Sequence, residues 1–364
     1  MSAFTACGSA PAAEDFALRI IDWQRRHGRH GLPWQGTRDP YRVWLSEIML
    51  QQTQVSTVLA YYPRFLARFG NVQQLADAPL EDVLALWSGL GYYSRARHLH
   101  RCAREVAWHL GGAFPRTAQQ LATLPGIGPS TAAAIAAFCF GERAAILDGN
   151  VKRVLTRAFG VADDLSVPAH ERALWQRAQA LLPATDLPRA MPAYTQGLMD
   201  LGATVCTRSR PHCAACPLQS GCVATREGNP TRYPVKTRRL RRSQQTLWLL
   251  HALDPQGRTW LAPRPARGIW AGLHCLPAFD TQQALLHTLP ASARAQTITH
   301  PPFTHVLTHR DLHIHIVTAC LPAAALPGPL PDGNGARGQW HSAATWPALG
   351  LPAPVRRFLQ QPLP

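Results

Sequence analysis

The chain has 364 residues, more than one hydrophobic core usually covers, so we expect two domains. Its 37 Lys and Arg residues against 21 Asp and Glu residues give a formal net charge of +16, which predicts a polyanionic partner such as nucleic acid. The sequence contains no apolar run of the roughly 18 residues that a spanning helix needs, which argues against a membrane protein.

The N-terminal residues, MSAFTACGSAPAAEDF, lack the basic start and apolar core of a signal peptide, so we expect a cytoplasmic protein. From Phe16 to about Ala224 apolar residues recur at spacings of three and four, a pattern that predicts helices. Strand-like alternation is scarce in this part of the chain. We therefore expect an all-helical N-terminal domain.

An acidic residue interrupts the apolar helical segment WLSEIMLQQTQV, residues 44–55. Glu47 has no basic residue within four positions to pair with it. If its carboxyl group is buried, its pKa is raised and it can hold a proton at neutral pH, as a general acid must. The alternative is a glutamate that points to solvent from the outer face of the helix. The glutamines that follow, among them Gln52, carry amides that could read base edges or fill a vacated stack.

A glycine-rich turn precedes a helix in LPGIGPSTAAAIAAF, residues 124–138. Gly126 and Gly128 permit a tight turn, and Pro129 suits the first helical turn. The free N–H groups at such a helix start can bind a phosphate. A helical hairpin without a ligand is the alternative, because a Gly-x-Gly turn by itself is a weak signal.

One carboxylate precedes a basic stretch in AAILDGNVKRVLTRAFG, residues 144–160. Asp148 can cap the helix that begins near Asn150, since a short carboxylate accepts the free N–H groups there. It can also act in catalysis, in front of a surface where Lys152 and Arg153 attract phosphates. The segment alone favours the cap.

Four cysteines crowd into CTRSRPHCAACPLQSGC, namely Cys206, Cys213, Cys216 and Cys222. Four thiolates at this spacing can surround one metal centre, either a tetrahedral zinc or a cubane iron–sulfur cluster. A disulfide framework is disfavoured in a reducing compartment. Arg208 and Arg210 lie in the first loop of this segment, which predicts a metal-stabilised basic finger that faces DNA.

Residues 226–245, REGNPTRYPVKTRRLRRSQQ, are rich in Pro and Arg, and we expect a basic linker with no apolar face to bury. After Thr246 the runs TLWLLHAL, TWLAPRP and HIHIVTACL predict short strands between Pro and Gly turns. A smaller α+β domain is the expected result. The expected division is then a helical domain over 1–225, a linker over 226–245 and the C-terminal domain over 246–364.

Together these segments resemble an adenine DNA glycosylase of the MutY type, within the helix-hairpin-helix glycosylase superfamily. The resemblance rests on SEIMLQQTQV, LDGNVKRV, the cysteine spacing, GLGYYSRARHLH at 89–100 and MDLGATVCTRS at 199–209, and it extends over nearly the whole chain. It implies an all-helical catalytic domain with a [4Fe-4S] cluster and a C-terminal α+β Nudix-like domain. The implied reaction is hydrolysis of the N-glycosidic bond of adenine opposite 8-oxoguanine or guanine in double-stranded DNA.

The resemblance also assigns roles to individual residues. Glu47 matches the general acid and Asp148 the essential aspartate, while Gln52 and Tyr92 match residues that push into the duplex. The other residues expected at the DNA are Gly126, Gly128, Ser130, Lys152, Arg153, Arg208 and Arg210, and the four cysteines match the cluster ligands.

The two carboxyl groups need opposite protonation states. The sugar becomes cationic when a flipped base leaves, so Asp148 has to be ionised while Glu47 is protonated. We expect the apolar setting of Glu47 to raise its pKa and the helix N-terminus to lower that of Asp148.

Ser130 marks a departure from other members of the superfamily. Endonuclease III-like members carry a lysine at the matching position, where an amine can form a Schiff base with the sugar and cut the strand. Pro129 precedes Ser130, and no lysine follows it before Lys152. We expect a monofunctional glycosylase with weak or no lyase activity.

The C-terminal domain resembles the family's Nudix-like domain through GIWAGLHCLP, residues 268–277. A Nudix hydrolase needs several carboxylates on a helix to hold magnesium, but Asp280 is the one acid between Gly268 and Arg310. We therefore expect recognition without pyrophosphate hydrolysis. The segment HVLTHRDLHI matches the family's Phe-Ser-His recognition loop as Leu307, Thr308 and His309. Leucine removes ring stacking, the threonine keeps a hydroxyl for a purine edge, and a plain surface role stays open for the histidine.

Three classes of function fit a basic chain of this composition: a base-excision glycosylase, a structural DNA-binding protein with a cluster, and a nucleotide hydrolase. The pairing of Glu47 with Asp148 argues against the second class, and the missing acids argue against the third. We expect a bacterial, nucleoid-associated enzyme that acts as a monomer.

Overall fold

The computed structural model describes residues 13–237, 241–321 and 338–361. Residues 1–12, which carry most of the expectation about a signal peptide, lie outside these ranges. The chain forms two compact units, one of Met1–Ala76 with Arg101–Arg239 and one of Asp77–His100 with Leu240–Pro364. The second unit thus combines a short helical segment with the whole C-terminal part of the chain.

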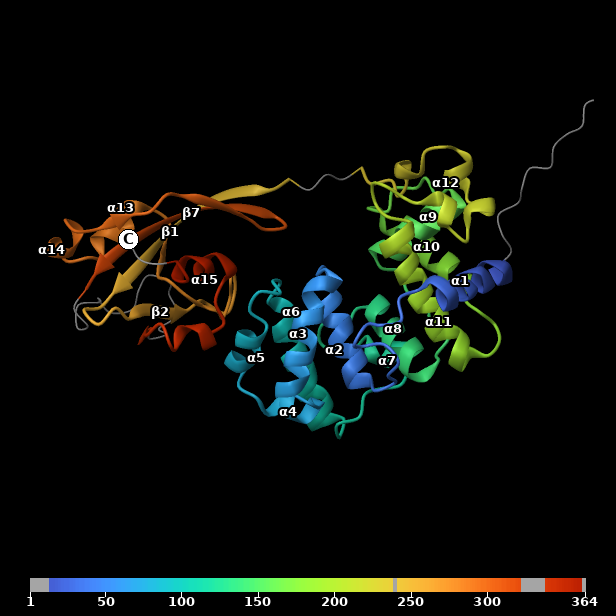
Figure 1. The fold of residues 1–364 in the computed structure, drawn as a ribbon, viewed down its shortest axis with the longest axis horizontal. Coiled ribbons are helices and arrows are strands. Elements are labelled where there is room, and N and C mark those ends of the chain that lie inside the picture. Colours follow the sequence, from blue (N-terminus) through green and yellow to red (C-terminus); the bar gives the residue numbers. More distant parts are fainter. Residues whose placement is uncertain (1–12, 238–240, 322–337, 362–364) are drawn as a thin grey trace, which may run out of the picture. The chain divides into compact units, whose positions relative to one another are not determined.

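The described part of the first unit is helical, as the apolar spacing predicts (Figure 1). Its α-helices are α1 Ala13–His27, α2 Pro40–Leu50, α3 Val55–Arg68, α4 Val72–Asp77, α7 Ala118–Leu121, α8 Pro129–Phe140, α9 Gly149–Phe159, α10 Pro168–Ala180, α11 Leu187–Asp200 and α12 Val223–Arg226. Two π-helical turns, η1 Glu105–His109 and η2 Leu201–Val205, and three 3-10 turns, η3 Cys213–Ala215, η4 Gln219–Gly221 and η5 Pro230–Arg232, complete it.

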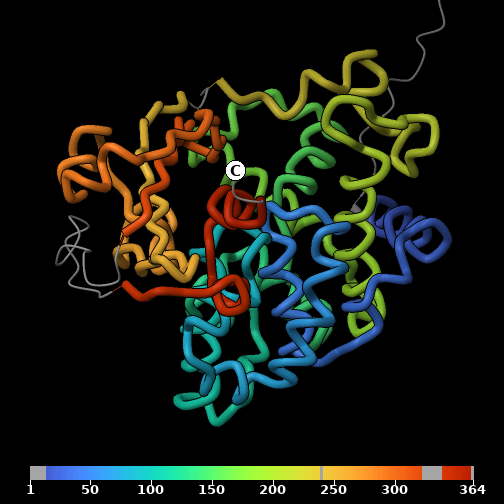
Figure 2. The backbone as a smooth tube through the Cα atoms, turned by 60° about the vertical axis from the view of Figure 1, so that its left-hand side comes forward, coloured from blue at the N-terminus to red at the C-terminus, as the bar shows by residue number. Residues whose placement is uncertain are grey.

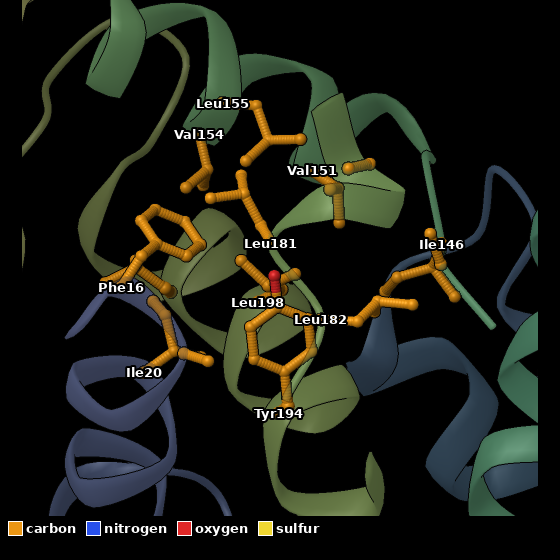
Figure 3. Packing of buried hydrophobic residues seen from close by; sticks show 14 of the residues in the cluster. Phe16, Ile20, Ile146, Val151, Val154, Leu155, Leu181, Leu182, Tyr194 and Leu198 are labelled. Atoms are coloured by element: carbon orange, nitrogen blue, oxygen red, sulfur yellow. The ribbon is translucent and has the colours of Figure 1, made fainter. Parts of the chain in front are cut away.

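The core of the first unit lies beneath α9 (Figure 3). Val151, Val154 and Leu155 recur at helical spacing on one face of α9 and are buried. Phe16 and Ile20 of α1 pack against the same cluster. Helix α1 lies beside α11, at the other end of the unit's sequence (Figure 2). The apolar face of α9 therefore fixes the position of its N-terminus.

The second unit contains a mixed sheet with α5 Leu80–Leu86, α6 Ser94–Arg104 (which ends in the first unit), α13 Gln282–His287, α14 Ala291–Arg294, η6 Trp346–Ala348 and α15 Ala353–Leu359. Its strands are β1 Ser243–Leu253, β2 Thr259–Pro263, β3 His274–Cys275, β4 Ala278–Phe279, β5 Ile298–Thr299, β6 Phe303–Val306, β7 Arg310–Cys320 and β8 Gln339–His341. The predicted strand runs are confirmed, and with them the α+β class of this part.

The two long strands β1 and β7 pair in parallel from Ser243 with Arg310 to Leu253 with Cys320. Four consecutive residues are buried in the second half of each strand, 249–252 in β1 and 316–319 in β7, as in strands that are covered on both faces. The order across the sheet is β3-β2-β1-β7-β5, with β4 on β1, β6 on β7 and β8 on β2, and these other pairings are antiparallel. The antiparallel β6–β7 hairpin places residues 307–309 at its turn.

The basic segment 226–245 is more structured than its composition predicts. Tyr233 is 3% exposed, and its carbonyl accepts a hydrogen bond from Arg157 Nε (3.2 Å). The expectation that this segment buries no apolar side chain is therefore wrong at Tyr233, and β1 already begins at Ser243. None of the helices in the described ranges is long and apolar enough to cross a bilayer.

Candidate active site

Helix α2 carries Glu47 into the interior of the first unit. The helix begins at Pro40, where Asp39 caps it by accepting a hydrogen bond from Tyr41 N (2.9 Å). Ser46 and Ile48 on either side of Glu47 are buried, and Glu47 itself is partly exposed. Burial and, second, the negative charge of Asp148 raise the pKa of Glu47 to about 8. The predicted direction of this shift is confirmed, and the two acids that the sequence singles out influence each other.

Asp148 is the N-cap of α9, as the sequence of its own segment suggests. Its Oδ1 accepts hydrogen bonds from Asn150 N (3.0 Å) and Val151 N (2.8 Å). Among the described residues, no hydrogen-bond donor reaches Oδ2. The cap and a catalytic role are therefore compatible, because one oxygen holds the helix and the other is left for a cation.

The predicted direction of the Asp148 pKa shift is wrong. Burial raises the pKa of this carboxyl group, although the two N–H groups and the charges of Arg153 and Lys152 act to lower it. The prediction took into account that the helix start lowers the pKa, but the sequence does not reveal that the carboxyl group is buried, which raises it. Two backbone N–H groups stabilise the ionised form of Asp148, whereas no such hydrogen bonds stabilise the ionised form of Glu47. Asp148 is therefore the first of the pair to lose its proton.

The glycine turn leads into α8, and Ser130 in its first turn contacts the residue before Asp148. Gly126 has φ of 79°, which favours glycine, whereas Gly128 is the extended N-cap of α8 and leaves open space where a Cβ would stand. Ser130 Oγ accepts a hydrogen bond from Leu147 N (3.1 Å), the residue before Asp148. This bond connects the start of α8 to the irregular segment that precedes the aspartate.

The basic residues after Asp148 are already engaged within the protein. Lys152 Nζ lies 2.6 Å from Glu171 Oε1. Arg153 donates to the carbonyls of Cys206 (2.7 Å) and Gly202 (2.6 Å) and to Asn150 Oδ1 (2.9 Å). The guanidinium thus connects the first turn of α9 to η2 and the cysteine segment.

The four cysteines line one small pocket together with Arg157. Burial first, and then the other three cysteines, raise the pKa of the Cys216 thiol to about 12. No group of three His, Cys, Asp or Glu side chains within the described ranges is arranged to hold a metal ion. The side chains of Arg208 and Arg210 in the same segment are exposed.

Arg157 is the buried anchor of this loop. It is 2% exposed and donates to the carbonyls of Thr207 (2.6 Å), Arg208 (2.8 Å) and Tyr233 (3.2 Å). Its Nη1 also lies 3.4 Å from Cys206 Sγ. The sequence shows Arg157 in a basic stretch, but it does not reveal that the side chain donates hydrogen bonds to three separate carbonyls.

The two residues expected to push into a duplex both have a left-handed backbone conformation. Gln52, in the turn after α2, has φ of 56°, and Tyr92, in the second unit, has φ of 48°. Left-handed φ at residues other than glycine costs about 1–3 kcal/mol and gathers at functional sites. Both side chains are exposed.

The recognition loop is placed beside Tyr92 within the second unit. The hydroxyls of Tyr92 and Thr308 form a hydrogen bond of 3.0 Å. Leu307 N donates to Arg310 O (2.8 Å), which closes the tight turn, and Thr308 and His309 are exposed at its tip.

Residues 45–180 match the HhH-GPD superfamily of base excision DNA repair proteins, and residues 248–361 match the NUDIX domain. The adenine DNA glycosylase of Buchnera aphidicola subsp. Baizongia pistaciae is 34% identical over 346 residues, which are 94% of this chain and 95% of the relative. The chain belongs to the adenine DNA glycosylase family. The adenine DNA glycosylase of Mus musculus is 44% identical over 218 residues, 57% of this chain and 41% of the relative. Among solved structures, a thermostable thymine-DNA glycosylase matches 59% of this chain and 97% of its own, with TM-score 0.52 and 29% identity.

Membership in this family makes the protein an enzyme of base excision repair that hydrolyses the N-glycosyl bond of adenine in DNA. The predicted fold class is confirmed in both parts, a helical glycosylase domain followed by a Nudix domain with a mixed sheet. DNA is its partner, as the charge predicts.

Sequence reasoning missed a pocket of about 510 Å³ in the first unit. Val43 and Ser46 of α2 line it, the latter next to Glu47, and Phe138 lines it from α8. Further lining residues include Arg29, Trp34, Gln35 and Gln196. The pocket has the size of a site for a small molecule. The single aspartate in the apolar run GLMDLG and the segment LPWQ were the available signals in the sequence.

Replacing Arg157 tests whether its guanidinium holds the cysteine loop. Arg157→Met leaves three carbonyls without their donor, and we expect a loss of about 2–4 kcal/mol in the free energy of unfolding. Urea denaturation measures this loss, with Arg172→Met on the exposed face of α10 as the matched control. Equal midpoints for the two variants would contradict the anchoring role.

Proposed function

We propose that the enzyme removes adenine paired with 8-oxoguanine or guanine and that it does so without cutting the strand. The observation that carries the chemistry is the unequal pair of acids, Glu47 with a pKa near 8 beside Asp148, whose ionised form is hydrogen bonded. Two carboxyl groups with different proton affinities supply an acid and an anion at the same pH.

In the proposed reaction, the target adenine leaves the base stack and is held between the two acids. Glu47 gives its proton to a ring nitrogen of adenine, which turns the base into a neutral leaving group. The bond between the base nitrogen and C1′ then breaks, and its electron pair stays with adenine. Asp148 stabilises the cationic sugar through its charge, and water adds to C1′ and releases one proton.

Substitution of the two acids tests their roles. Asp148→Asn keeps the cap geometry but removes the charge, and Glu47→Gln removes the proton, so we expect adenine release to fall at least about a hundredfold in each variant. Single-turnover base release measures the rate, and Asp163→Asn and Glu14→Gln serve as exposed controls. Retention of a tenth of the rate, a loss of about 1.4 kcal/mol or less, would contradict the assignment.

The same assignment predicts a pH dependence. The raised pKa of Glu47 means that it stays protonated below about pH 8, so the rate of adenine release should fall as the pH rises through 8. In acid the rate should fall again, because Asp148, whose pKa is also raised, then gains a proton. Single-turnover base release measured across the pH range checks both limbs.

DNA contacts follow from what is exposed around the site. We propose that Gly126, Gly128 and Ser130 present backbone N–H groups to a phosphate, and that Arg208 and Arg210 contact the neighbouring DNA backbone.

Lys152 and Arg153 then contribute chiefly through their charge, because Glu171 already pairs with the lysine and three internal acceptors already bind the arginine. Gln52 and Tyr92 would push into the duplex from left-handed turns.

Absence of lyase activity follows from the chemistry of Ser130. Its hydroxyl accepts a bond from Leu147 N, and a hydroxyl cannot form the Schiff base that a lysine amine forms. The nearby Lys152 pairs with Glu171. We propose that the product is an intact strand with an abasic site.

We propose that Leu307, Thr308 and His309 read the base opposite adenine. The tight turn, the exposed Thr308 and the adjacent Tyr92 support this role. On this proposal the chemistry belongs to the helical domain, 1–225, and the recognition to the domain 246–364, with 226–245 between them. Residues 77–100 pack with the C-terminal part, so truncation would expose them and point variants are the cleaner test.

A panel of duplexes with adenine opposite 8-oxoguanine, guanine, cytosine or thymine tests the proposed substrates. We expect release in the order 8-oxoguanine, then guanine, then the others, with no strand cut before alkali treatment. Thr308→Ala with His309→Ala should reduce the preference for 8-oxoguanine over guanine by about 1–3 kcal/mol, the range for one or two lost hydrogen bonds. Ser292→Ala, exposed on α14, is the control, and an unchanged preference would move the reading of the lesion elsewhere.

We propose that Cys206, Cys213, Cys216 and Cys222 hold a [4Fe-4S] cluster. Four thiols that line one pocket are the donor set for such a cluster or for zinc. The spacing of the cysteines and membership in the adenine DNA glycosylase family favour the cluster over a single zinc. When bound, the cluster would act as a structural centre for the basic loop.

Metal analysis of protein purified without oxygen tests the cluster. We expect about four iron atoms and four acid-labile sulfides per chain, with a brown colour. Cys206→Ser should lower the iron content, while Cys320→Ser, at an exposed cysteine far from this loop in sequence, should not. One zinc per colourless chain would contradict the cluster assignment.

Because its substrate is DNA, we also propose that the enzyme works at the nucleoid in the cytoplasm, and that it does so as a monomer.

A further inference from the structure

Tyr92 stands in a strained turn, residues 89–92. Gly89, Gly91 and Tyr92 itself have φ of 106°, 72° and 48°, all in the left-handed region. Such a backbone at a residue other than glycine persists only where the surrounding structure over-determines it. The side chain of Tyr92 is 45% exposed, so its own packing supplies little of that restraint. The restraint has to come from the residues next to the turn.

Part of the restraint comes from Arg95, three residues after Tyr92. Arg95 is buried, and its Nη2 donates to the carbonyls of Leu90 (3.2 Å) and Gly91 (3.1 Å). Its backbone N–H donates to Tyr92 O (2.9 Å), and its guanidinium lies 5.5 Å from the centre of the Tyr92 ring. These contacts fix the shape of the turn, but they do not fix its position in the second unit.

One backbone carbonyl near the C-terminal end of the chain holds the turn on both sides. Leu351 O accepts from Ser88 Oγ (3.2 Å), one residue before the turn, and from Tyr93 Oη (3.0 Å), one residue after it. A Cβ at the preceding Gly350 would lie 3.1 Å from the backbone carbon of Leu84 in α5, so glycine permits this close approach. Two hydroxyl groups therefore attach the turn to the segment that ends at Leu351.

Arg356 of α15 holds this segment, residues 347–351, in place. Its Nη2 donates to Leu349 O (2.6 Å) and its Nη1 to Pro347 O (3.1 Å). Its Nε donates to Ser88 Oγ (3.2 Å). A hydroxyl group has one proton, and because Ser88 Oγ accepts from Arg356, that proton is left for the carbonyl at position 351. The guanidinium therefore joins the two sides of the contact directly.

We propose that Arg356 is a positioning residue for Tyr92. By holding Ser88 and the segment 347–351 together, it fixes the turn from which Tyr92 enters the duplex. The inference rests on the role proposed above for Tyr92. It adds that this role depends on the C-terminal part of the chain, so that opening of the duplex and reading of the opposite base belong to one compact unit.

The test measures opening of the duplex separately from the chemistry. 2-Aminopurine next to the target adenine fluoresces more strongly when it is unstacked, and a 2′-fluoro sugar at the target resists hydrolysis because fluorine destabilises the cationic sugar. Arg356→Met should reduce this fluorescence rise at saturating protein. On an ordinary duplex with adenine opposite 8-oxoguanine, it should lower the single-turnover rate about threefold to tenfold, the range for one hydrogen bond.

Matched variants control for charge and for folding. Arg357→Met removes the same charge from an exposed position of α15 and should change neither readout. Ser88→Ala and Tyr93→Phe each remove one hydroxyl group and should lower both readouts, whereas Ser292→Ala should not. Thermal unfolding followed by circular dichroism checks each variant. If Arg356→Met does not fold, Ser88→Ala takes its place in the comparison.

Tyr92→Ala decides whether Arg356 acts through Tyr92. The loss caused by Arg356→Met should disappear in the Tyr92→Ala background, because a displaced turn then has no ring to misplace. An equal loss in both backgrounds would make Arg356 a general structural residue and overturn the inference. Unchanged fluorescence and rate in Arg356→Met and in Ser88→Ala would overturn it as well.

Failure of the proposed function gives a different result. If the unaltered protein releases no adenine from any duplex, the proposed reaction fails, while the fluorescence comparison still decides the role of Arg356. If Tyr92→Ala by itself changes neither fluorescence nor rate, the role of Tyr92 fails and the inference fails with it.

Discussion

In the proposed reaction the carboxylate of Asp148 must stay charged in a partly desolvated place, and the residues around the start of α9 bear on that requirement. Two N–H groups at the start of α9 hold one of its oxygens, and the charges of Lys152 and Arg153 lie close enough to favour the anion. Burial opposes them and raises the pKa. The helix start thus limits a cost that burial imposes, and it leaves the nearby Glu47 with the higher proton affinity.

The position of that helix start is fixed from behind by the cysteine segment. Arg153 joins Asn150, in the first turn of α9, to the carbonyls of Gly202 and Cys206. A Cβ at Gly202 would lie 2.6 Å from Asn150 Cβ, so glycine allows η2 to approach α9 this closely. Disturbance of the cysteine segment therefore reaches Asp148 through one arginine and one close backbone contact.

The positive charge of the chain does two different kinds of work. Inside the first unit, Arg157 donates hydrogen bonds to backbone carbonyls and Arg29 pairs with a carboxylate. A guanidinium has five N–H donors and therefore suits several acceptors at once. Arg208 and Arg210 remain exposed, where long-range attraction to phosphates costs little desolvation. The net charge of +16 therefore overstates the number of cations that a DNA backbone can meet.

Sequence alone determined the features that depend on local pattern and on residue chemistry. The spacing of apolar residues determined the helices up to Ala224 and the strands that follow, because burial of one face imposes that period. The chemistry of a carboxyl group in an apolar segment likewise identified Glu47, and the short carboxylate before a helix identified the cap at Asp148.

Tertiary structure decided what depends on partners distant in the chain. The direction of the Asp148 pKa shift, the internal use of Arg153 and the burial of Tyr233 all come from desolvation and from acceptors tens of residues away. The same holds for the fully buried Asp200, whose partner Arg29 lies 171 residues away in the sequence. A pattern of spacing contains no information on which of two distant polar groups becomes the acceptor, since that is settled only when both are removed from water together.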